Sequence, residues 1–253
     1  MKNYPTNLTE NQYRAILAII GDKRKRQRSL KEVLDAMFYL LKTGCQWRML
    51  PSDFPKWELV YYYFNKWSHD GTLEEIHEVL RKRVRQKRGR LPSPSVAIID
   101  SQSVKTTKTG GECRGIDGGK KIKGRKRHIV TDTQGLLLAV EVHAANEHDS
   151  RSGFRVLEQL KYCFERMKKI YADGGYRGEL INKVRNKLDC DMEITLRSDK
   201  SEDFKPLPKR WIVERSFAWL EDFRRLAKDF ERTCCAAKNM IYLAFIALML
   251  KWI

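Results

Sequence analysis

Two stretches decide the fold, Val96-Ala97-Ile98-Ile99-Asp100 and Ile170-Tyr171-Ala172-Asp173. In each, a short apolar run ends at an aspartate. Such runs are typical of strands that are buried on both faces of a sheet. A third acid, Glu214, lies in a stretch of helical character, Arg-Trp-Ile-Val-Glu-Arg. Two carboxylates at strand ends and one on a helix can converge on a pair of divalent metal ions.

The charge balance indicates a polyanionic partner. The 253 residues include 50 Lys and Arg against 32 Asp and Glu, a formal net charge of +18. The cations cluster, notably at residues 23–28 and 81–90, which favours phosphate neutralisation over a general solubilising charge. Together with the three acids, this predicts an enzyme that cuts or joins nucleic-acid phosphodiesters.

Several classes of protein are not expected. None of the six cysteines forms a Cys-x-x-Cys pair, so we predict no structural zinc and interpret all six as reduced thiols of a cytoplasmic protein. The N-terminus lacks the apolar core of a signal peptide. The most apolar segment, residues 240–250, is too short for a membrane span and is expected to be a buried helix.

Residues 1–90 are expected to form a small all-α domain. Apolar residues recur at helical spacing. Thr9 and Ser29 suit helix starts, and Gly44 suits a helix end. Pro92 and Pro94 mark a boundary. The expected helices cover residues 8–20, 29–43, 57–68 and 73–84.

Residues 95–253 are expected to form an α/β domain. A strand at 96–99 is followed by a loop rich in Gly, Lys and Thr at 105–126, and then by two strands joined through a turn at 132–135. Helices and strands then alternate, which predicts a mixed sheet flanked by helices. The remaining expected elements are strands at 128–133, 136–142, 169–172 and 192–196 and helices at 149–167, 179–188 and 209–231.

Three motifs carry a family resemblance. They are Val96-Ala97-Ile98-Ile99-Asp100-Ser101-Gln102-Ser103-Val104-Lys105-Thr106, Tyr171-Ala172-Asp173-Gly174-Gly175-Tyr176-Arg177-Gly178, and Arg210-Trp211-Ile212-Val213-Glu214-Arg215-Ser216-Phe217-Ala218-Trp219-Leu220. At these residues the chain resembles the DDE transposases of bacterial insertion sequences, closest to insertion sequence family five of the family four/five superfamily. Residues 44–67, 121–127 and 145–150 also fit, so the resemblance covers nearly the whole chain. It implies a ribonuclease-H-like catalytic fold.

The resemblance also implies an activity. Asp100, Asp173 and Glu214 would hold two Mg²⁺ ions, for which Mn²⁺ can substitute. The enzyme would cleave double-stranded DNA at terminal inverted repeats and join the ends to a target site. It would work as a homodimer or larger assembly in the bacterial cytoplasm, associated with the nucleoid. The family four pattern has a Tyr and a Lys where this chain has Leu207 and Glu221.

Some site assignments stay open at this stage. Glu221 competes with Glu214, because both fall on one stripe of the same expected helix. Asp149 is either a helix N-cap or a metal ligand. The basic residues expected to contact DNA are Lys120, Lys121, Lys123, Arg125, Lys126, Arg127, Arg177, Arg210, Arg24, Arg26 and Arg28.

Other residues have simpler interpretations. Asp132 is expected to be a turn residue, and His128, His143 and His148 ordinary strand or loop histidines. Three alternative functions remain: a nuclease of the same fold without strand transfer, a domesticated DNA-binding protein, and a structural nucleoid protein. The last explains the charge but not the placed carboxylates.

Overall fold

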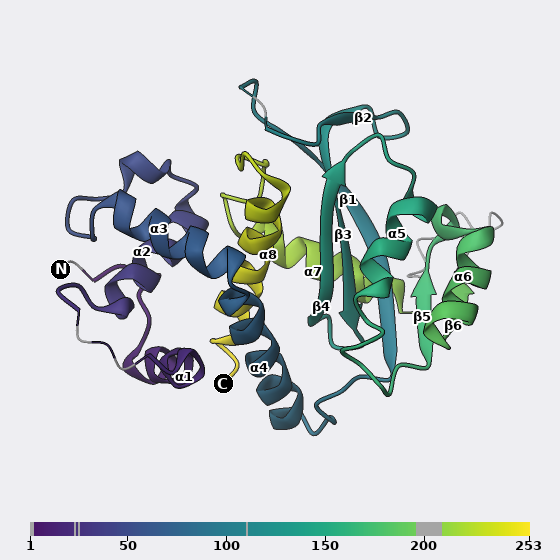
Figure 1. Cartoon of the computed structure of the whole chain (residues 1–253), viewed down its shortest axis with the longest axis horizontal. Helices are drawn as coiled ribbons and strands as arrows, with labels where there is room; N and C mark the ends of the chain where they lie inside the picture. Colours follow the sequence, from purple (N-terminus) through teal and green to yellow (C-terminus); the bar gives the residue numbers. More distant parts are fainter. Residues whose placement is uncertain (1–2, 23, 25, 110, 196–208) are drawn as a thin grey trace. The chain divides into compact units, whose positions relative to one another are not determined.

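The computed structural model describes residues 3–22, 24, 26–109, 111–195 and 209–253. The chain divides into two compact units (Figure 1). A helical unit contains Met1–Arg90 and Leu220–Ile253, and a sheet unit contains Leu91–Trp219.

The helical unit begins with four helices at the expected places. Thr9 and Ser29 each accept a hydrogen bond from a backbone N–H in the first turn, and in both cases the residue three positions on completes a capping box. Gly44 ends the second helix in the left-handed conformation, at φ 71°. The helices are α1 (Glu10–Ile20), α2 (Leu30–Thr43), α3 (Trp57–His69) and α4 (Thr72–Lys87), with a 3₁₀ turn, η1 (Trp47–Met49).

The fifth helix of this unit comes from the other end of the chain. Helix α8 (Cys234–Met249) packs against α2, α3 and α4 and is buried on nearly every side, which confirms the expected buried C-terminal helix. We expected residues 95–253 to form one domain. In the structure the compact sheet unit ends at Trp219, because the apolar surface of α8 is covered by the N-terminal helices. None of the helices in the described part of the chain is long and apolar enough to span a bilayer.

The described residues of the sheet unit form a mixed sheet, as expected, and it has six strands. Strand β1 (Val96–Lys105) lies at its centre, antiparallel to β3 (Ile122–Asp132) and parallel to β5 (Lys169–Ala172). On the outer side of β3 lie β4 (Leu137–Ala144) and the short β2 (Gly115–Asp117), and β6 (Asp191–Ile194) extends the sheet beyond β5.

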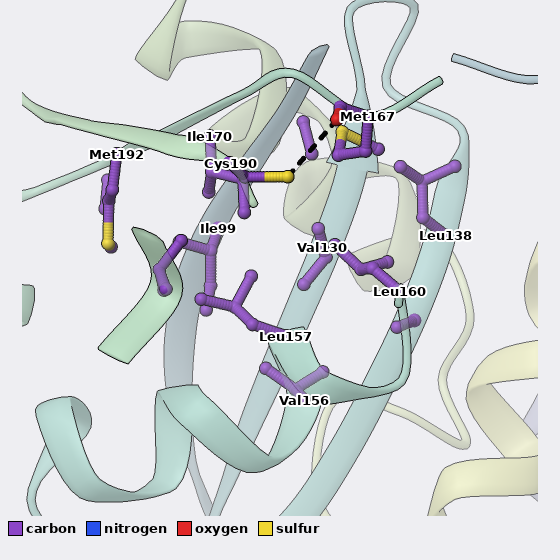
Figure 2. Packing of buried hydrophobic residues seen from close by; sticks show 14 of the residues in the cluster. Ile99, Val130, Leu138, Val156, Leu157, Leu160, Met167, Ile170, Cys190 and Met192 are labelled. Carbon is purple, nitrogen blue, oxygen red and sulfur yellow. Dashed lines mark hydrogen bonds between the residues drawn. The ribbon is translucent and has the colours of Figure 1, made fainter. Parts of the chain in front are cut away.

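Helices α5 (Asp149–Glu158) and α6 (Glu179–Leu188) pack together beside this sheet, and α5 contacts β3 and β4. Figure 2 shows their shared core, in which Ile99 and Ile170 of the central strands meet Val156 and Leu157 of α5. Side chains alternate along a strand, so Asp100 projects to the face opposite Ile99. A 3₁₀ turn, η2 (Gly174–Tyr176), follows β5, and α7 (Arg210–Glu221) closes the unit.

Four boundaries differ from expectation. Strand β1 runs to Lys105, because β3 pairs with it along its polar half. The expected loop at 105–126 therefore contains β2 and the start of β3. Helix α5 ends at Glu158 instead of Met167. Helix α7 ends at Glu221 instead of Glu231. Shortly after this end, the backbone amides of Arg224 and Arg225 donate to carbonyls of the last turn of α2 instead of to the preceding turn of α7.

Candidate active site

The two aspartates are neighbours across the parallel strands. In the β1–β5 register Ile98 lies beside Tyr171, and two residues further along the same direction lie Asp100 and Asp173. Asp100 is within β1 and not at its end as expected. Asp173 follows β5 directly and caps η2, accepting a hydrogen bond of 2.9 Å from the Gly175 amide.

Arg210 links the third acid to this pair. Its Nη2 lies 3.4 Å from Asp173 Oδ2, and its Nε lies 3.2 Å from Glu214 Oε1. The start of α7 is held to the sheet, since Lys209 Nζ donates to the Tyr171 hydroxyl at 2.6 Å. The chain therefore places Asp173 beside Asp100, and Arg210 joins Glu214 to Asp173 at the end of β5.

Burial sets the electrostatics of the acid pair. Loss of solvent raises the pKa of Asp100 to about 6; the Ser101 amide opposes this shift, and the negative charge of Asp173 adds to it. Tyr176 lies close by, and burial followed by the charges of Asp100, Asp149 and Asp173 raises its pKa well above 10. The group of acids therefore favours the binding of positive charge.

These residues fit a divalent metal ion. Carboxylate oxygens are the ligands that Mg²⁺ and Mn²⁺ prefer. The buried Tyr176 hydroxyl lies among the charges of Asp100, Asp149 and Asp173, which suits a site completed by a hydrated cation. The donor set would be Asp100, Asp173 and Glu214.

The basic run expected to contact DNA divides into two parts. Lys120, Lys121 and Lys123 are exposed on the β2–β3 hairpin, and Lys120 Nζ donates to the Ser101 carbonyl at 3.1 Å. The other three members of the run are buried. Their side chains are covered by the protein and cannot reach a phosphate on the surface, which contradicts our expectation of phosphate contacts. These three residues are Arg125, Lys126 and Arg127, at 0%, 5% and 2% exposure.

The remaining basic residues differ in their surroundings. Arg24 and Arg177 are exposed. Arg26 is half-buried in an ion pair with Asp22 and donates to the Tyr63 hydroxyl, whereas the exposed Arg28 pairs with Glu32 at 3.3 Å. Of these, Arg24, Arg28 and Arg177 have the exposure that a phosphate contact needs.

Sequence reasoning missed the role of Asp149. The N-cap of α5 is His148, and Asp149 instead contacts Ser101, Lys126 and His128. His128 is not an ordinary strand histidine either, because its Nδ1 lies 2.8 Å from His143 Nε2 inside the unit. Ser101, Lys126 and Asp149 fall within segments that carried the family resemblance, whereas His128 and His143 lie outside them.

A family model described as "Transposase DDE domain" matches residues 91–250, more than half of the chain. The chain belongs to this family. A second model, described as "Putative transposase of IS4/5 family", matches residues 8–77. The matches confirm the ribonuclease-H-like fold class and the family expected from the motifs. Family membership implies divalent-metal dependence.

One curated relative supports the same placement. The chain is 33% identical over 143 residues to the "Putative transposase for insertion sequence element IS402" of Burkholderia cepacia. The match covers 53% of this chain and 65% of the relative, slightly less than two thirds of the relative's length.

Proposed function

We propose that the protein is an insertion-sequence transposase that cleaves DNA at the ends of its element and joins the exposed 3′-hydroxyls to target DNA. The observation that supports this is the grouping of Asp100, Asp173 and Glu214 around the end of β5 in a member of the DDE family. The substrates would be the terminal inverted repeats and a target site, bound by a homodimer or larger assembly.

The acids would hold two Mg²⁺ ions, for which Mn²⁺ can substitute. When bound, such ions activate the attacking hydroxyl and stabilise the leaving oxygen. Asp100 and Asp173 come from adjacent strands, which hold both carboxylates rigidly. Arg210 keeps Glu214 close to Asp173 and offers a cation to the transferring phosphate.

DNA would be held mainly by phosphate contacts. The exposed lysines of the β2–β3 hairpin flank Asp100, and the exposed Arg177 follows the Asp173 turn. In this proposal residues 1–90 bind the element ends and residues 95–253 carry the catalytic elements. Contacts of this kind set affinity and register without specifying sequence.

The first test substitutes the central acid. Asp100→Asn removes the charge but keeps the shape, so binding to a duplex that carries the DNA flanking this reading frame should stay within about twofold, because phosphate contacts dominate affinity. Strand transfer should fall by about 10³-fold or more, as expected when charge stabilisation is lost from a transition state. Gel assays of end cleavage and joining measure both steps.

Glu214→Gln and Glu221→Gln form a matched pair on α7. Loss of activity in the first and retention in the second would support Glu214 as the third ligand, and the reverse would replace it with Glu221. Full joining activity in Asp100→Asn would overturn the proposed function. Cleavage by the wild type without joining, and without preference for the element ends, would point to a nuclease.

A further inference from the structure

Asp149 is held by three side chains that come from two strands. Its Oδ1 lies 2.9 Å from Lys126 Nζ, 3.3 Å from His128 Nε2 and 3.2 Å from Ser101 Oγ. Lys126 and His128 are buried, at 7% and 0% side-chain exposure, while Asp149 is 28% exposed. Burial acts to raise the pKa of Asp149, but His128 and Lys126 outweigh it and hold the pKa well below its usual range.

This carboxylate touches the neighbours of both catalytic aspartates. Ser101, which it binds through Oδ1, directly follows Asp100. Its Oδ2 faces Gly175, two residues after Asp173: a Cβ added at Gly175 would lie 3.4 Å from Asp149 Oδ2 and 3.1 Å from Asp173 Oδ1. The first distance is an ordinary van der Waals contact, and the second is tight by a few tenths of an ångström, so the turn passes close to both carboxylates.

The support behind Asp149 is rigid. His128 stacks on His143, with ring centroids 4.9 Å apart, and their nitrogens are 2.8 Å apart. Lys126 Nζ also donates to the Glu147 carbonyl at 2.9 Å. Because these groups lie in strands β3 and β4, they fix Asp149 relative to the sheet and not only to its own helix.

Alternation along β1 places Ser101 and the Asp100 carboxylate on opposite faces of the strand. Ser101 faces the side of α5, where Asp149 lies, and Asp100 faces the opposite side. Asp149 therefore contacts β1 on the face opposite the Asp100 side chain, and it also lies close to the turn at Gly175. Its Oδ1 contacts Lys126, His128 and Ser101, so this oxygen is not open to a metal ion.

We propose that Asp149 is a positioning residue of the reaction, which sets the spacing of the Asp100 and Asp173 carboxylates through Ser101 and the Gly174–Gly175 turn. Lys126 and His128 hold it in place. The proposal rests on the proposed function for its link to catalysis, while the bracing itself is a property of the metal-free fold. Outer residues of this kind typically change metal affinity or activity by 10- to 100-fold.

The test compares Asp149→Asn with Glu147→Gln in the full-length protein. Glu147 is the matched control, since its carboxylate belongs to the same cluster but contacts His143, Ser152 and Arg155. Asp149→Asn should weaken Mn²⁺ binding, followed by electron paramagnetic resonance, by about 10-fold or more. It should also speed amide hydrogen exchange at residues 173–177 and at Ser101 in metal-free protein. Glu147→Gln should change neither.

Activity supplies a further readout. In Asp149→Asn the rate of single-turnover cleavage of the flanking-DNA duplex should fall by about 10- to 100-fold with DNA affinity unchanged, and higher Mn²⁺ should restore part of the rate. Wild-type metal affinity and exchange in Asp149→Asn would overturn the proposal. Equal effects in Glu147→Gln would also overturn it, since they would indicate a general structural role.

A second variant guards against loss of folding, because Asp149→Asn leaves the buried Lys126 without its nearest counter-charge. Ser101→Ala removes only the hydroxyl contact, and should produce a smaller loss of Mn²⁺ affinity in the same direction. Adding Ser101→Ala to Asp149→Asn should cause no further loss. Additive losses would overturn the proposal. If the wild type binds Mn²⁺ but cleaves no DNA, the proposed function fails, while affinity and exchange still decide the role of Asp149.

Discussion

At the scale of single residues, the acid pair costs stability when no metal is present. Asp100 has a pKa of about 6, raised first by burial and further by Asp173. The unfolded chain ionises near pH 3.8. The destabilisation by Asp100 is therefore absent below pH 3.8, grows as the pH rises, and is complete above about pH 6.

We therefore predict that Asp100→Asn stabilises the metal-free protein at pH 7.5, by at most about 3 kcal/mol for a shift of two pH units. The gain should shrink at pH 5, where the wild-type carboxyl is largely protonated. Urea unfolding in the presence of a chelator measures it. A gain of the same size at both pH values would contradict this account of the burial of Asp100.

Residue identities were predictable to different degrees. Asp100, Asp173 and Glu214 stand in local patterns, so the sequence pointed to them. Lys126 was expected on the surface because a charge run is usually solvated, and its burial depends on Asp149, 23 positions further along the chain. No local pattern encodes such a pairing.

At the scale of elements, α4 carries a buried histidine against α8. His77 is 3% exposed and packs beside Tyr242, with ring centroids 5.0 Å apart. Burial, and then the charge of Arg81, lowers its pKa from 6.5 to about 3. Below pH 6.5 His77 is protonated in the unfolded chain but stays neutral in the folded chain. The stability that neutral His77 contributes is therefore fully present above pH 6.5 and is lost as the pH falls towards 3.

We predict that His77→Leu reduces the acid sensitivity of the helical unit. The wild type should lose about 1.4 kcal/mol per pH unit through this residue between pH 6 and pH 4. The variant should lose correspondingly less, and comparison with the wild type cancels the titration of other groups. Urea midpoints at pH 7.5 and pH 5 provide the measurement, and parallel losses in the two proteins would refute the prediction.

Elements were predictable where the local pattern is strong. The caps at Thr9, Ser29 and Gly44 and the apolar run of β5 each lie at or next to the boundary that the structure has. The ends of β1 and α7 differ from the predicted ones. Strand β1 is extended by its pairing with β3, and α7 is cut short by hydrogen bonds between the following residues and the end of α2. Both causes are long-range.

At the scale of the whole molecule, the helical unit depends on a helix from the far end of the chain. Phe245 of α8 is fully buried, and α8 contacts α2, α3 and α4. Phe245→Ala should destabilise this unit by about 3–5 kcal/mol, the usual cost of removing a buried aromatic ring. Hydrogen exchange by mass spectrometry should then show faster exchange in α2–α4, while β1, β3 and β5 keep their protection. Equal acceleration in both units would show that they unfold together.

The sequence by itself determined the class of this protein: a basic chain with carboxylates placed after apolar runs, a mixed sheet and the family to which it belongs. Periodicity, caps and motif spacing are local, so they can be read along the chain. The tertiary structure decided which residues meet. It placed Asp173 beside Asp100 through strand register, buried Lys126, and brought Asp149 to Ser101 across 48 positions. These contacts follow from sheet pairing and burial, which depend on segments far apart in the sequence.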